Sequence, residues 1–173
     1  KTWSSKENIS QSDKLQWNIE YYKLNDKLLL TWSEGDLDHA VGADLNADSD
    51  FRLSAVAKAL GAFDLKGRYF DLDGNPLGDS FAIAGDENAA INSLDAVENE
   101  DGTVELYYER RAYNRNASAL TELMSQEQTI CKAILDSEGK KAVEDTRFLI
   151  QSADGKENYR TTELKSFSYN GIE

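Results

Sequence analysis

The sequence is poor in the residues that make covalent or metal cross-links. Its 173 residues include one cysteine, Cys131, and one histidine, His39. A disulfide needs two cysteines, and zinc sites take their ligands from several cysteine and histidine side chains. The composition therefore excludes an internal disulfide and a Cys/His metal cluster. Cys131 stands in the apolar stretch 130–135, where we expect a small buried side chain rather than a nucleophile.

Long hydrophobic runs and excess basic charge are missing as well. No run of about twenty apolar residues occurs, so a transmembrane helix is not expected. The chain has 32 acidic and 19 basic residues and a formal net charge of −13. A field of this sign repels phosphate backbones and anionic membrane surfaces. Nucleic acid and membrane insertion are therefore not expected, whereas divalent cations suit such a surface.

The chain has enough apolar residues to fold. Hydrophobic side chains make up 40% of it, and they include 3 Trp, 8 Tyr and 6 Phe. A chain of this length buries a substantial core, and we expect residues 1–173 to form a single β-rich repeat domain. The one proline, Pro76, falls in an expected turn, where it does not interrupt a strand.

Two segments have the pattern of a β-hairpin and resemble each other. In the first, residues 16–23 alternate apolar and polar side chains, and a turn at Asn25-Asp26 leads to an apolar run that ends at Thr31-Trp32-Ser33. In the second, residues 93–99 lead through Asp101-Gly102 to a run that ends at Tyr107-Tyr108-Glu109. Turn residues between alternating runs favour hairpins.

A second repeated block follows each hairpin. Residues 54–60 match residues 118–124 position by position, and both have the composition of a short helix. After each comes a strand with a tight turn and then a returning strand: 67–74 and 80–84 in the first copy, 131–139 and 146–151 in the second. Each unit thus has four strands and a short helical insertion, with a period of roughly seventy residues.

These units predict an all-β or mainly β fold with short helical insertions, a fragment of a β-propeller-like repeat array of about two blades. A third copy starts at Thr161 and stops at Ile172, and residues 1–4 look like the tail of the same kind of strand. We therefore expect the chain to begin and end within a repeat. Either its ends complete one strand together, or, as we favour, it is a piece of a longer array. Longer helices would instead indicate a compact α+β domain.

The turn sequences carry a resemblance to a known family. Residues 70–81, FDLDGNPLGDSF, followed by residues 100–108, EDGTVELYY, resemble the blade repeat of large bacterial secreted and RTX-type surface proteins. In that family a D-x-D-G-N-x-x-G-D turn ends one strand, and a later D-G turn leads into a strand that closes on aromatic residues. The resemblance covers residues 60–110 best. It implies a propeller-like architecture and an extracellular or cell-surface location.

One acidic segment has the spacing of a calcium loop. Asp44, Asn46, Asp48 and Asp50 place oxygen-bearing side chains at alternate positions, as a tightly turned calcium loop requires. The competing interpretation is a polar cap for the helix that follows. A second acidic turn, residues 71–75, fits a plain hairpin turn better than a metal site, because Asp and Asn bond to the backbone in turns.

No pattern identifies an enzyme. Nucleophile-elbow, phosphate-loop and dinucleotide motifs are missing, and residues 152–155, SADG, miss the sialidase Asp-box by one residue. Several aromatic side chains stand at alternating strand positions, where we expect them in the core rather than on a sugar-stacking platform. These side chains are Trp3, Trp17, Trp32, Tyr107 and Tyr108.

The resulting functional expectation is a non-enzymatic secreted or cell-surface module that serves binding and adhesion and is stabilised by calcium. Its partner would be the remainder of the propeller or another protein chain. The alternative is a fragment of a propeller-type glycan hydrolase or a carbohydrate-binding lectin, in which two of the many carboxylates would form a catalytic pair.

The calcium loop can be tested by thermal melting. We expect calcium to raise the Tm of the intact chain relative to chelator, because a ligand that binds only the folded state stabilises it. Asp48→Ala should abolish this rise, whereas Asp73→Ala, in the other acidic turn, should preserve it. An unchanged Tm in the intact chain would assign residues 44–50 to helix capping.

Overall fold

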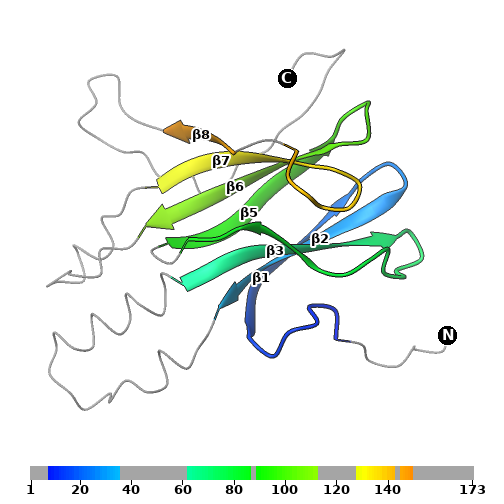
Figure 1. Ribbon diagram of the computed structural model, residues 1–173, viewed down its shortest axis with the longest axis horizontal. Helices are drawn as coiled ribbons and strands as arrows, with labels where there is room; N and C mark the ends of the chain where they lie inside the picture. Colours follow the sequence, from blue (N-terminus) through cyan, green and yellow to red (C-terminus); the bar gives the residue numbers. More distant parts are fainter. Residues whose placement is uncertain (1–7, 36–61, 87–88, 113–127, 143–144, 150–173) are drawn as a thin grey trace, which may run out of the picture.

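The computed structural model describes residues 8–35, 62–86, 89–112, 128–142 and 145–149 (Figure 1). The strands in these residues are β1 (Leu15–Lys23), β2 (Lys27–Gly35), β3 (Ala62–Asp71), β4 (Phe81–Ala84), β5 (Ala89–Glu98), β6 (Val104–Ala112), β7 (Gln128–Leu135) and β8 (Thr146–Leu149). No helix occurs in the described residues, so the mainly β class is confirmed. The helices expected at 54–60 and 118–124 lie outside them.

The strands form two antiparallel four-stranded meanders. β1 to β4 pair in sequence order and make the first unit, and β5 to β8 pair in the same way and make the second unit. A short parallel pairing of β3 with β5, at Ala62–Ala89 and Phe63–Ala90, joins the units into one sheet. The predicted four-stranded units are thereby confirmed. The described sheet is open, and closure into a propeller ring stays a prediction.

The two units share their irregularities as well as their strands. The pairing of β1 with β2 shifts register between Trp17 and Glu20, and the pairing of β5 with β6 shifts between Ser93 and Asp95. Such bulges insert extra residues on one strand and increase its local twist. Both shifts interrupt the first strand of a unit opposite the middle of the second, so the two units share this feature at the same place.

The turns after β3 and β7 also match. In the first unit, Gly74 N donates to Asp71 O at 3.0 Å, and Gly74 has a φ of +87°. In the second, Gly139 N donates to Asp136 O at 3.1 Å, and Gly139 has a φ of +80°. Glycine adopts this left-handed conformation without steric cost. The second turn therefore keeps its geometry although its sequence has diverged, and Pro76 lies in the first turn as expected.

The hydrophobic core lies between the two units. Alternation along β2 and β3 turns Leu29, Leu65 and Tyr69 to one face, and β4 adds Ile83. The second unit contributes a larger set of buried side chains: Ile91, Val104, Leu106, Tyr108, Cys131, Ala133 and Leu135. These residues form one cluster, so each unit buries an apolar face against the other. Burial of such side chains is the main stabilising contribution to the fold.

Hydrogen bonds from hydroxyl groups connect the two units in the middle of their interface. Thr31 and Ser33 face the second unit from β2 and are almost fully buried. Thr31 Oγ1 lies 2.7 Å from Ser93 Oγ, and Ser33 Oγ donates to the Ile91 carbonyl at 2.7 Å. A buried hydroxyl without a partner costs free energy, so these bonds specify how β2 crosses β5.

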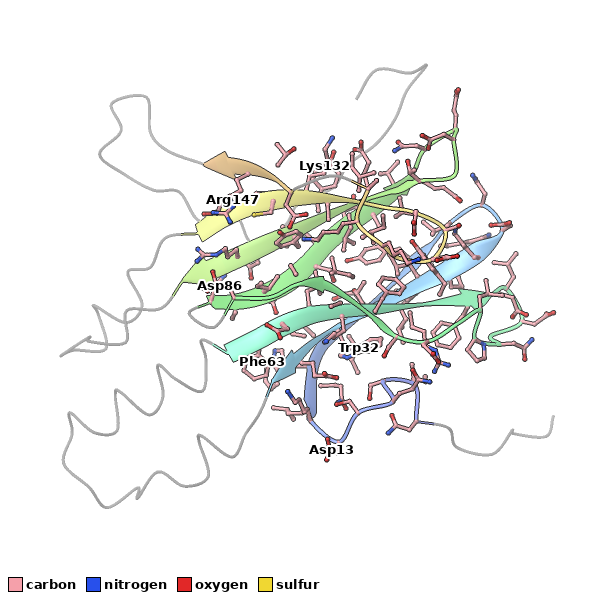
Figure 2. All side chains as sticks on the ribbon, in the orientation of Figure 1. Asp13, Trp32, Phe63, Asp86, Lys132 and Arg147 are labelled. Carbon is pink, nitrogen blue, oxygen red and sulfur yellow. The ribbon has the colours of Figure 1, made fainter. Side chains whose placement is uncertain are left out.

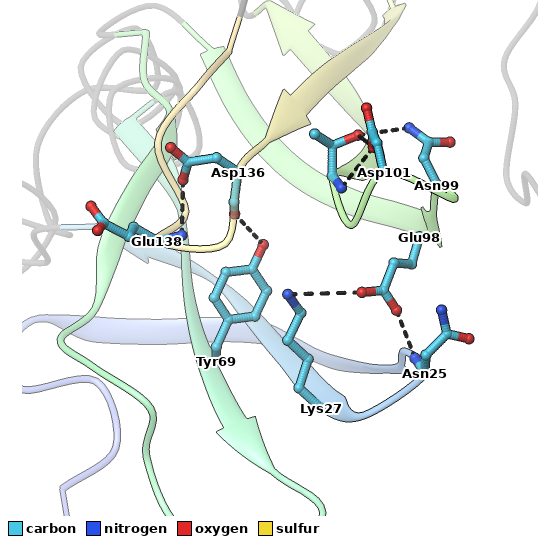
Figure 3. Close-up of polar contacts among 9 residues, drawn as sticks. Asn25, Lys27, Tyr69, Glu98, Asn99, Asp101, Asp136 and Glu138 are labelled. Atoms are coloured by element: carbon cyan, nitrogen blue, oxygen red, sulfur yellow. Dashed lines mark hydrogen bonds and ion pairs between the residues drawn. The ribbon is translucent and has the colours of Figure 1, made fainter.

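A second set of polar contacts joins the ends of the units (Figure 3). Glu98, at the end of β5, lies 3.8 Å from Lys27 Nζ and accepts a bond from Asn25 N at 2.7 Å. Tyr69 Oη donates to the Asp136 carbonyl at 3.2 Å. Burial raises the pKa of the Tyr69 hydroxyl, with the Asp136 and Glu98 charges acting in the same direction, so it remains a donor at neutral pH.

The contact of the second turn with β4 can be tested by alanine substitution. A Cβ on Gly139 would overlap the Phe81 ring, whereas a Cβ on Gly102, at a similar φ of +82°, would meet nothing within 4 Å. We expect Gly102→Ala to cost about 1–2 kcal/mol of unfolding free energy from the backbone alone. Gly139→Ala should cost about 1–3 kcal/mol more because of overpacking. Urea denaturation measures both, and equal losses would contradict the packing of Phe81 on Gly139.

Candidate binding surface

The expected calcium loop, Asp44 to Asp50, lies outside the described residues. The other acidic turn, at residues 71–75, is described and is a hairpin turn. Asp71 Oδ1 accepts bonds from Asp73 N at 3.0 Å and Asn75 N at 2.7 Å, and Oδ2 accepts from Asn75 Nδ2 at 2.8 Å. The Asn75 side chain, followed by its backbone N–H, lowers the pKa of Asp71. The carboxylate therefore organises its own turn.

Most of the remaining described acidic side chains with assigned contacts form ion pairs. In the part of the chain that the structure describes, no group of three or more His, Cys, Asp or Glu residues could hold a metal ion. The ion pairs are Lys27–Glu98, Arg110–Asp86, Arg111–Glu109, Lys132–Glu105, Lys140–Glu138 and Lys141–Asp145. One of them joins neighbouring strands: Lys132 Nζ on β7, labelled in Figure 2, lies 3.1 Å from Glu105 Oε1 on β6. These ion pairs engage carboxylates of the described residues in contacts within the fold.

The one cysteine is a core residue, as predicted. Cys131 is 1% exposed and lies in the interface between the units. Burial raises the pKa of its thiol, so the thiolate that a nucleophile requires is disfavoured at neutral pH. Burial likewise raises the pKa of Tyr22 to about 12. These groups are structural.

The aromatic side chains divide into two groups. Trp32 and Tyr108 are buried, at 2% and 4% exposure, which confirms the core prediction for them, and Tyr107 is half-buried. The prediction was wrong for Trp17, which is 60% exposed, and Trp3 lies outside the described residues. The reason is position, because β1 is an edge strand and its register shift begins at Trp17.

Three large side chains on β1 are exposed, but the register shift separates them, because Trp17 pairs with Ser33 whereas Tyr21 pairs with Leu30, on the opposite face of β2. Trp17, Ile19 and Tyr21, here called the β1 strip, are 60%, 62% and 73% exposed. The alternation of apolar and polar residues in the sequence predicted the spacing of these side chains. It did not predict their burial, because a period of two does not indicate which face of a strand is covered by another element. Exposed aromatic and aliphatic side chains that cluster on one element mark interaction surfaces.

A groove adjoins the strip. It has a volume of about 220 Å³ and is lined by Asn8, Ile9, Ser10, Gln16, Ile19, Leu30 and Trp32. Residues ahead of β1 form one wall, and Arg68 Nη1 fixes this wall by donating to the Ile9 carbonyl at 3.0 Å. Asp13 of the same segment and Trp32 on β2 are marked in Figure 2. The groove is mainly apolar and suits an aliphatic or aromatic group.

The chain was compared with known proteins. No protein family, curated protein or solved structure matches it. The described residues also include no helix with the length and apolar character needed to cross a membrane. Its function must therefore be inferred from its own surface.

The interpretation of residues 71–75 as a self-contained turn can be tested by NMR titration. Asn75→Ala should move the pKa of Asp71 back up toward its ordinary value, because the Asn75 side chain is the largest cause of the lowering. The pKa of Asp101, lowered by Thr103, should not change. Because the folded pKa of Asp71 is lowered, its contribution to stability is present above about pH 4 and is lost as the pH falls. An unchanged Asp71 pKa in the variant would contradict this interpretation.

Proposed function

We propose that this chain is a non-enzymatic secreted or cell-surface binding module, which serves adhesion or assembly by contacting another protein through the β1 strip. The observation that carries the proposal is the exposure of Ile19 and Tyr21, at 62% and 73%, next to an apolar groove that Ile19 lines; Trp17, 60% exposed, lies toward the other face of β1. Trp and Tyr contribute most to binding energy in protein interfaces when they become buried there.

The chemistry of the described residues supports binding rather than catalysis. Ionisable groups with perturbed pKa values in a cleft would indicate an active site. The tyrosines with raised pKa values, Tyr22, Tyr69 and Tyr108, are instead packed in or against the core between the units. The groove beside β1 is lined by amide, hydroxyl and apolar side chains and has no ionisable group in its lining.

Calcium and an extracellular location belong to the same proposal. The resemblance to secreted bacterial surface repeats supports the location, and the spacing of Asp44, Asn46, Asp48 and Asp50 supports calcium as a structural ion. The net charge of −13 suits a soluble surface that binds divalent cations. In this proposal calcium stabilises a loop and takes no part in a reaction.

Beads coated with the chain test the binding proposal. We expect coated beads to aggregate with one another or to be retained on bacterial or epithelial cells, and Ile19→Glu with Tyr21→Glu should abolish this because charges cannot enter an apolar interface. The matched control is Leu72→Glu with Leu77→Glu, whose side chains are 54% and 56% exposed in the β3–β4 turn. Coated beads that neither aggregate nor bind cells would contradict the proposal.

A carbohydrate-binding lectin is the second candidate, and the exposure of Trp17 favours it. Trp17 and Tyr21 lie on the same strand as the exposed carboxylate of Glu20. Aromatic faces stack on sugar rings, and a nearby carboxylate accepts bonds from sugar hydroxyls. On a glycan array, binding that Trp17→Ala removes and Trp17→Phe retains would establish this function. An array without signal would exclude glycans of the classes printed on it.

A further inference from the structure

The two units can be placed in register through their shared turns. The residue before Asp71 pairs with Leu28, and the residue before Asp136 pairs with Val104. Side chains on one face of a strand recur at every second residue. The correspondence therefore continues along β2 and β6, in which Leu28, Leu30 and Trp32 match Val104, Leu106 and Tyr108.

Matched residues define matched faces. We call the face that carries Val104, Leu106 and Tyr108 the leading face of the second unit, and the face that carries Leu28, Leu30 and Trp32 the leading face of the first unit. The opposite face of the first unit, with Leu29, Thr31 and Ser33, is its trailing face. In the structure, the leading face of the second unit packs on the trailing face of the first.

The packing of the two units is consequently head-to-tail. A face of one unit meets the other kind of face on its neighbour, not a copy of itself. Such heterologous contacts leave one unmatched face at each end and propagate into rings or arrays. In the first unit it is the leading face that has no second four-stranded unit against it in the described residues.

Exposure differs between the matched leading faces. Val104 and Leu106 are 0% exposed in the second unit, whereas Leu28 and Leu30 remain partly exposed in the first. The difference is larger on the first strand of each unit. Ala96 pairs with Leu106 and packs against the core, but its counterpart Tyr21, which pairs with Leu30, is 73% exposed.

The edges of the units differ in the same way. β5 is joined at Ala89 and Ala90 to β3 of the unit that precedes it. β1, its counterpart, is the edge strand of the described sheet. Among the described residues, the edge strand of the first unit thus has no preceding strand, and its leading face is covered only in part, where residues 8–10 lie beside Leu30 and the buried Trp32.

We propose that the leading face of the first unit, with Ile19, Tyr21 and Leu30, binds the trailing face of a further four-stranded unit of the same kind. This inference rests on the proposed binding function and names its partner. The partner must present aliphatic and small hydroxyl side chains, as Leu29, Thr31 and Ser33 do. The start of β1 would then pair in parallel with the third strand of that unit, as β5 does with β3.

An extended chain tests this directly. A copy of residues 8–86, carrying Ile19→Val and Tyr21→Phe so that its peptides differ in mass, is placed ahead of the full chain. Hydroxyl-radical footprinting then reports the exposure of each side chain. We expect oxidation of Ile19 and Tyr21 in the original chain to fall to the level of buried Trp32. Leu72 and Leu77, exposed in the β3–β4 turn, should keep their oxidation rates.

A matched control separates specific packing from crowding. The same extension with Thr31→Glu and Ser33→Glu in the added copy should leave Ile19 and Tyr21 oxidised as in the unextended chain, because its trailing face carries charge. Continued protection of Trp32 shows that the added copy has folded. Full oxidation of Tyr21 beside a folded, unmodified copy would overturn the inference.

Two further outcomes concern the source of the partner. Protection of Tyr21 in the unextended chain that grows with its concentration would show that a second copy of this chain supplies the further unit, and this would support the inference. Bead aggregation or retention without protection in the extended chain would preserve the binding proposal and refute only its partner. Protection of Tyr21 in the extended chain, without bead aggregation or retention on cells, would support the inferred partner and contradict the proposed binding function.

Discussion

The structure depends on the burial of one apolar face of each four-stranded unit against the other. A four-stranded sheet with one uncovered apolar face is not stable alone in water, so each unit requires a neighbour. Leu29, Leu65 and Tyr69 from the first unit meet Val104, Leu106 and Leu135 from the second in a continuous cluster. The ion pairs and turns described above lie at the strand ends and on the outer surface, and they add to the stability that this packing provides.

Polar contacts give the apolar packing its direction. Apolar burial is not directional, and two flat faces could slide over each other. The Thr31–Ser93 contact and the Ser33 bond to the Ile91 carbonyl set the crossing point of β2 and β5. Glu98 and Tyr69 then fix the ends. These polar contacts therefore fix how the first unit is placed against the second.

The same constraint links architecture to function. An open array of repeats that bind their neighbours through unlike faces has one face left over at each end. In the first unit that face adjoins the exposed β1 strip, so the surface that the fold leaves uncovered is also the surface best suited to bind a partner. Architecture and binding therefore concern one set of residues, Ile19, Tyr21 and Leu30, whereas Trp17, which pairs with Ser33, lies toward the other face of the edge strand.

The sequence by itself determined the eight strands, their order and the twofold repeat, because turn residues and alternation are local signals. It also identified Cys131 as a core residue, from the apolar stretch around it. Only the tertiary structure decided which alternating residues are covered. Trp17 and Trp32 have similar sequence contexts, yet one is exposed on an edge strand and the other is buried on an inner strand. That difference arises from which element lies against each face, and no local pattern contains this information.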